Sequence, residues 1–244
     1  MKRATKIGFA AMILGAAAVA SAQDTVTIDV FGYQKVDIPP AGGVNLVGFS
    51  FTSDQTVYLV DVFGTNQLTQ STRSRNADKV YVWNGSSYDT FFQKPDGVFY
   101  DVYSGSAATA EVAPGAALFL QSPLSASTTN VVTLSGAVLL SDSEQVAYQG
   151  LLTLANPYPA DLDLNGTNVD WSAATASNRS RNADKMYIWN PGTAQYDSFY
   201  LDASRVWQPL ISSVQSAVLP AGGGAFYDAK NSFTNSVVRP FSVN

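Results

Sequence analysis

The chain contains a long internal repeat. The heptapeptide Arg73–Lys79 recurs letter for letter as Arg179–Lys185, so the two copies are offset by 106 residues. Ten of the twelve positions from Arg73 to Asn84 are identical to those from Arg179 to Asn190. Such a repeat constrains the architecture before any single residue is interpreted, because each copy must build the same unit. It also predicts that a site built into the repeated unit occurs twice.

The first 22 residues are expected to be a secretory signal peptide. Lys and Arg residues among the first six are followed by the apolar run Ile7–Val19 and by small residues at Ala20–Ala22. This order is typical of a cleaved leader. The apolar run is short for a membrane span, and no later segment is long enough for one. We therefore expect a mature chain from Gln23, exported to the cell surface or medium of a Gram-negative-type bacterium.

Composition narrows the possible functions. Removing the leader takes away three of the 14 basic residues and none of the 19 acidic ones, so the mature net charge is 11 − 19 = −8. Such a chain is a poor nucleic-acid binder, because phosphate contacts need clustered Lys and Arg. It has no His and no Cys, which removes the commonest general base and all thiol chemistry. A carboxylate pair could still hydrolyse glycosides, but the acidic residues are scattered at turns. We expect no enzymatic activity.

The mature chain has the pattern of an all-β protein. Short runs of Val, Thr, Tyr and Ile alternate with polar residues, and Gly, Asn, Asp and Pro punctuate them roughly every ten residues. No segment after the leader shows a helical period. The sequence predicts two tandem, mostly antiparallel β-sandwich domains from an internal duplication. Their expected bounds are 23–129 and 130–244, and the second domain carries an extra C-terminal strand.

The end of the repeated motif predicts a hairpin in each domain. With Asn84-Gly85 as a two-residue turn, Trp83 would face Ser86 and Tyr81 would face Tyr88. The second copy has a two-residue insertion after Asn190, and there Tyr187 would face Tyr196 across a longer loop. Such a hairpin is apolar on both faces. One face belongs to a sandwich core, and the other must be covered by a loop, the other domain or a partner.

A third element recurs at the same spacing, and it occurs three times. Val26–Ile28, Val132–Leu134 and Val238–Pro240 are each 106 residues apart, so a twofold repeat carries one surplus boundary strand. That strand either pairs within its own molecule or adds to the open edge of a neighbouring subunit. The second alternative is head-to-tail and propagates into a filament unless it closes into a ring. The candidate assembly residues are Val26, Ile28, Val30, Val237, Val238 and Phe241.

A possible calcium site lies in the second repeat. Asp161, Asp163 and Asn165, followed by Gly166, fit the first half of an EF-hand loop. The twelfth position is Ser172 instead of the bidentate Glu, and the first repeat has no counterpart. The alternative is a strand that ends at an Asn-Gly turn. Calcium is the only cofactor that the sequence suggests.

Two further features have competing interpretations. The repeated heptapeptide is either a ligand-binding loop or a structural corner, and its presence in both repeats favours the corner. The aromatic residues of the hairpins are sugar-stacking platforms, core residues or subunit contacts. The aromatic surface candidates are Tyr81, Trp83, Tyr187 and Trp189.

The segments Lys79–Gly85 with Tyr88, and Leu154–Pro159, resemble uncharacterised secreted two-repeat β proteins of environmental Gram-negative bacteria. That resemblance implies export and a repeated β fold, and it does not indicate any particular activity. The sequence as a whole therefore predicts a secreted structural subunit whose partners are copies of itself, assembled into a filament or surface layer by strand addition. The alternative is a carbohydrate-binding or adhesive surface module that binds glycans.

Overall fold

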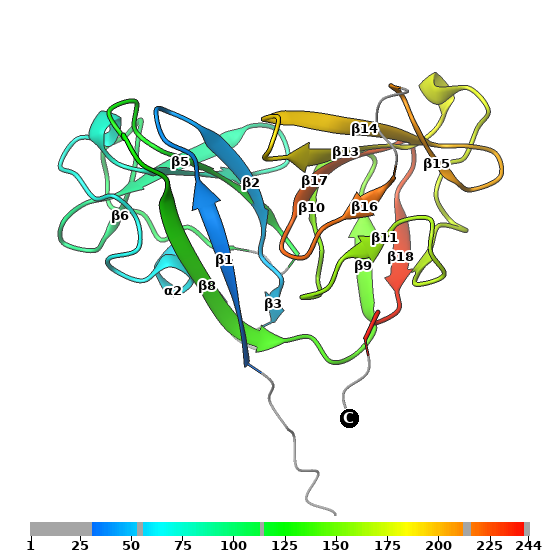
Figure 1. The fold of residues 1–244 in the computed structure, drawn as a ribbon, viewed down its shortest axis with the longest axis horizontal. Coiled ribbons are helices and arrows are strands. Elements are labelled where there is room, and N and C mark those ends of the chain that lie inside the picture. The colour runs from blue at the N-terminus through cyan, green and yellow to red at the C-terminus, as the bar shows by residue number, and fades with distance from the viewer. Residues whose placement is uncertain (1–30, 53–55, 113–114, 212–215, 242–244) are drawn as a thin grey trace, which may run out of the picture.

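The computed structural model describes residues 31–52, 56–112, 115–211 and 216–241. These residues form an all-β structure in which every strand pairing is antiparallel. Two β-sandwiches lie side by side, the first coloured blue to green and the second green to red in Figure 1. The expectation of an all-β sandwich fold is confirmed.

The first sandwich packs a five-stranded sheet against a three-stranded one. The larger sheet has the order β2-β7-β4-β5-β6 and the smaller one the order β1-β8-β3. The bounds of these strands are β1 Phe31–Ile38, β2 Val44–Gly48, β3 Phe51–Thr52, β4 Lys79–Trp83, β5 Tyr88–Gln93, β6 Phe99–Asp101, β7 Ala117–Gln121 and β8 Asn130–Val138.

The second sandwich repeats the larger sheet with the same strand order, β10-β17-β13-β14-β15. Opposite it lie the sheet β12-β18-β9 and the two-stranded pair β11-β16. The bounds are β9 Ser143–Ala147, β10 Gly150–Ala155, β11 Leu162–Asp163, β12 Val169–Asp170, β13 Lys185–Asn190, β14 Gln195–Leu201, β15 Trp207–Pro209, β16 Val218–Leu219, β17 Gly224–Ala229 and β18 Phe233–Val237.

The middle copy of the boundary strand lies in the first sandwich. Val132 and Leu134 are buried in β8, which pairs along its length with β1 and at its end with β3. The sequence places residue 130 at the start of the second domain, whereas the sheet pairing assigns residues up to Val138 to the first. The reason is that β1 runs antiparallel to β8 and buries the same apolar face.

Each sandwich has its own apolar core, formed by alternate residues of its strands. In the first hairpin Val80 and Val82 point into one core, and in the second Met186 and Ile188 point into the other. The first core is also closed by one short helix, α2 Leu59–Phe63. The sequence does not predict this helix, because five residues are too few to show a helical period.

The first hairpin turns one residue later than the sequence predicts. Trp83 pairs with Tyr88, and Tyr81 pairs with Thr90, so the predicted Tyr81–Tyr88 pairing is wrong. The cause is Asn84, whose side-chain Oδ1 accepts hydrogen bonds from the backbone N–H groups of Ser86 and Ser87. Asn84 therefore precedes the turn as an Asx residue instead of lying inside it.

The second hairpin has the equivalent register across its longer loop. Trp189 pairs with Tyr196, and Tyr187 pairs with Ser198 instead of with Tyr196 as predicted. In the first hairpin Tyr81 and Tyr88 remain in contact, with ring centroids 6.2 Å apart at right angles. They meet as diagonal neighbours, a distance that aromatic rings can span.

The repeated heptapeptide forms a structural corner in both sandwiches. Its two copies contain the 3-10 turns Ser74–Asn76 and Ser180–Asn182, followed by the fully buried aspartates Asp78 and Asp184. The carboxylate of Asp78 accepts hydrogen bonds from Thr69 N and Asn130 Nδ2. Each aspartate thus ties the preceding loop to its sandwich, Asp78 through Thr69 N and the side chain of Asn130, and Asp184 through Thr175 N and Lys230 N.

Candidate functional site

The two large sheets pack against each other through the faces that point away from the two cores. Phe119 and Phe226 lie at the centre, with ring centroids 6.3 Å apart. Trp83 meets Phe226 edge-on at 6.1 Å, and Trp189 meets Phe119 in the same way at 5.7 Å. Tyr88 and Tyr196 complete the cluster. The second apolar face of each hairpin is therefore covered by the other domain.

The aromatic candidates of the sequence mostly belong to this contact. Trp189 is 7% exposed, and Trp83 and Tyr187 are partly buried against the same cluster. Tyr81 lies beside it and donates its hydroxyl hydrogen bond to Gln121 Oε1. The indole N–H groups of Trp83 and Trp189 have no partner among the described residues. These side chains therefore act by packing, and they do not form an exposed platform.

Two backbone hydrogen bonds cross the domain contact in a nearly symmetric way. Gly48 N donates to Gly222 O, and Ala155 N donates to Gly115 O, each at 2.9 Å. The donors and the acceptors are each 107 residues apart in the chain. Near the centre, Ser50 Oγ donates to Asn156 O. The two sandwiches are thus joined through equivalent residues of the two repeats.

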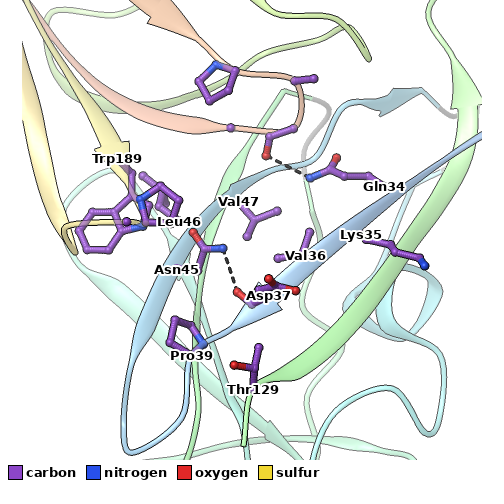
Figure 2. A pocket seen from close by; sticks show the side chains of 16 residues that line it. Gln34, Lys35, Val36, Asp37, Pro39, Asn45, Leu46, Val47, Thr129 and Trp189 are labelled. Carbon is purple, nitrogen blue, oxygen red and sulfur yellow. Dashed lines mark hydrogen bonds between the residues drawn. The ribbon is translucent and has the colours of Figure 1, made fainter.

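A large cleft lies beside this contact, in the side of the first sandwich. Its volume is about 620 Å³. One wall is β1, from Gln34 to Asp37, and another is β2, from Asn45 to Val47. The second domain closes it with Trp189 and the turn Pro220–Gly223 (Figure 2). A cleft of this size can take a small ligand or several residues of an extended chain.

The wall formed by β1 is an open sheet edge. The carbonyl oxygen of Asp37 accepts a hydrogen bond from Asn45 Nδ2, so the backbone of Asp37 points away from β8. Thr133, which is opposite Lys35, likewise donates its N–H away from β1, to Gln67 Oε1. Because strand groups alternate in direction, the N–H and C=O groups of Tyr33 and Lys35 also point outward. Within the described residues they have no strand partner.

The side chains of β1 divide into two faces. Gln34 and Val36 lie on the face toward the cleft and the core, and the amide of Gln34 donates to Gly222 O at 3.1 Å. Gly222 has a φ of +67°, and a Cβ there would overlap the Gln34 amide. Lys35 lies on the opposite, solvent face and points away from Trp189 in Figure 2. On that same face Phe31 and Tyr33 are each 75% exposed.

The second sandwich has a smaller counterpart of this cleft. It lies along β9, whose register with β18 matches that of β1 with β8 after a shift of 106 residues. Ser143 to Gln145 line it, together with Gly115 and Pro157, and its volume is about 120 Å³. Of these two described clefts, the one beside β1 is therefore the larger, although the sheet edge is repeated.

The C-terminal copy of the boundary strand docks on its own chain. Val237 is buried at the end of β18, and Val238, which is 46% exposed, donates its backbone N–H to Asn168 O. Arg239 donates from Nη1 to Leu140 O at 2.7 Å. Phe241 packs on both cores, with its ring 6.0 Å from that of Tyr158. The N-terminal copy, with Val26, Ile28 and Val30, lies outside the described residues.

The calcium candidates are used in local structure. Asp161 Oδ1 accepts a hydrogen bond from Ala221 N, and Asp163 Oδ1 accepts one from Asn165 N. Asn165 Oδ1 accepts from Trp207 N at 2.7 Å. Among the described residues no three carboxylate-type ligands gather into a metal-binding group. These contacts agree with the strand-and-turn alternative.

Comparison with protein-family models, curated proteins and solved structures gives no match to this chain. Among the described residues, no helix is both long and apolar enough to cross a membrane. Sequence reasoning missed Gln34, Lys35 and Asn45, which shape the cleft. The alternation of Phe31–Ile38 was the available signal, but only the fold shows which edge of that strand is free.

Proposed function

We propose that the protein is a secreted structural subunit that assembles head to tail by adding a strand to the outer edge of β1. The observation that carries this proposal is the open edge at Tyr33 and Lys35, which lies beside a cleft with room for another strand. Unpaired sheet edges are templates for pairing with another chain. Neighbouring strands need a spacing of about 4.8 Å, and the cleft provides free volume on that side.

The asymmetry of the two clefts supports a linear assembly. A subunit with one roomy acceptor edge and one donor strand can bind one copy on each side. A contact of this kind is heterologous, so it extends into a filament when the rotation between copies does not close a ring. The exposed rings of Phe31 and Tyr33 give the same strand apolar surface that a neighbour can bury.

Proline at position 35 tests the proposal. The N–H of Lys35 points outward, so Lys35→Pro leaves the hydrogen bonds between β1 and β8 in place and removes a donor that an added strand needs. Lys35→Thr is the matched control, because it keeps the N–H. We expect filaments from the control and only monomers from the proline variant, with equal circular dichroism. Filaments from the folded proline variant would contradict assembly at this edge.

The glycan-binding alternative now depends on the cleft itself, because its aromatic candidates pack between the domains. The side-chain amides of Asn45 and Gln34 are the polar groups there, and Trp189, although packed between the domains, also lines the cleft. A glycan array probed with the Lys35→Pro monomer tests it directly. Binding that is lost on Asn45→Leu would favour this function over assembly.

A further inference from the structure

We infer that the donor strand is the N-terminal segment Val26–Val30 of a second copy, held in the cleft with Asp29 beside Lys35. This inference rests on the proposed function and names the partner of the same site. Of the three boundary-strand copies, the middle one is buried in β8 and the C-terminal one is docked on its own chain. Only the N-terminal copy is left to act as a donor.

The pattern of the segment fits the two faces of β1. Val26, Ile28 and Val30 alternate with Thr27 and Asp29, and successive strand residues point to opposite sides. A strand laid along the outer edge of β1 therefore places its three apolar residues on the face of Val36. The cleft wall on that face includes Leu46 and Val47. The donor's polar residues then lie on the solvent face.

The charges on the two strands favour one residue of β1 as the neighbour of Asp29. The expected mature segment Gln23–Val30 contains Asp24 and Asp29 and no basic residue. On the solvent face of β1, the single cation is Lys35. Opposite charges on adjacent strands stabilise their pairing by up to about 1 kcal/mol, and like charges oppose it. Lys35 therefore favours a register that brings Asp29 beside it.

The segment is poorly placed to pair with its own β1. Val30 is followed directly by Phe31, the first residue of β1. To fold back onto the edge of its own β1, the segment needs a turn of about two residues. Residues at its C-terminal end, including Val30, would form that turn and would be lost from the pairing. A second copy can supply all five residues.

Charge reversal in the full mature chain tests the assignment. At low salt, where surface charges are weakly screened, Asp29→Lys and Lys35→Asp should each raise the critical concentration for assembly by about tenfold. Mixing the two variants in equal amounts should restore assembly, because each donor then meets an acceptor of opposite charge. Arg181→Asp, an exposed change in the second domain, is the control and should assemble as the unchanged protein does. Thermal unfolding of each variant checks that it is folded.

The possible outcomes test the N-terminal donor separately from assembly at the edge of β1. If both single variants assemble as well as the unchanged chain, another donor is used and this inference is wrong, while the proposed assembly stands. If assembly returns in the doubly changed chain but not in the mixture, the segment pairs with its own β1, which also overturns the inference. If the unchanged chain stays monomeric at every concentration, the proposed function itself is wrong.

Discussion

Phe119 and Phe226 occupy equivalent positions of the two repeats, 107 residues apart, and their rings lie 6.3 Å apart across the domain contact. Each also meets the tryptophan of the opposite hairpin edge-on. The repeat thus provides both sides of a contact that neither domain forms alone. The aromatic residues that a sequence survey selects as a possible binding surface hold the two sandwiches together.

The first prediction concerns this contact. Trp189→Ala should lower the free energy of unfolding by about 3 to 5 kcal/mol, the usual cost of removing a large buried aromatic side chain. Its indole N–H has no partner among the described residues, so Trp189→Phe should cost clearly less. Urea denaturation measures both variants. Tyr103→Ala, at an 83% exposed position, is the control, and an equal loss there would argue against the contact.

The second prediction concerns the repeated corner. The carboxylate of Asp184 accepts hydrogen bonds from Thr175 N, Lys230 N and the Tyr227 hydroxyl. Asp184→Ala leaves these three donors, of which the Tyr227 hydroxyl is buried, without their acceptor and should destabilise the chain by about 3 kcal/mol. Replacing the neighbouring exposed Arg181 with Ala should change stability little. If the two variants have the same free energy of unfolding, the aspartate does not hold the heptapeptide in place.

The third prediction concerns alkaline pH. Burial raises the pKa of Tyr196 to about 12, and burial also raises the pKa of Tyr88. Burial, with the nearby Asp184 carboxylate, also raises the pKa of Tyr227. The folded state therefore disfavours tyrosinate, whereas the unfolded chain ionises near pH 10. The contribution of these tyrosines to stability should be constant below about pH 10 and fall above it.

Tyrosinate absorbance during an alkaline titration checks this prediction. The buried tyrosines should ionise late and together with unfolding. Tyr227→Phe, which removes one of these groups, should be less stable at neutral pH and lose less stability between neutral pH and pH 11. Ionisation of every tyrosine near pH 10 in a chain that remains folded would contradict the burial of these rings.

The fourth prediction concerns the turn that closes the cleft. Asn156 is fully buried, and its side-chain amide donates to Leu219 O and Ala160 O while its Oδ1 accepts from Tyr158 N. Asn156→Leu should destabilise the chain by about 2 kcal/mol, because buried backbone acceptors lose their donor. Hydrogen exchange should show faster opening of the Pro220–Gly223 turn. Unchanged protection there would mean that Asn156 does not hold the cleft wall.

The fold class follows from the sequence because strand alternation and turn residues are local signals. The hairpin register does not follow from the sequence, because Asn84 can lie inside a turn or directly before it. In the fold, Asn84 Oδ1 accepts hydrogen bonds from the backbone N–H groups of Ser86 and Ser87, which places it before the turn. The sandwich to which β8 belongs is likewise not a local signal. The periodicity of β8 shows that Val132 and Leu134 are buried, but it cannot show in which of two similar sandwiches.

The cleft is a property of the assembled fold. Gln34 and Gly222 are 188 residues apart and meet only because the two large sheets pack against each other. The sequence does show that a boundary segment occurs three times at equal spacing. The fold adds what spacing cannot, namely that the C-terminal copy is docked on its own chain and that the edge of β1 is open.

Negative-stain imaging of the purified mature chain tests the central claim most directly. Head-to-tail strand addition predicts unbranched filaments one subunit wide, which disappear on dilution and in the folded Lys35→Pro variant. Uniform single particles of one chain each, unchanged as the concentration rises, would contradict the account.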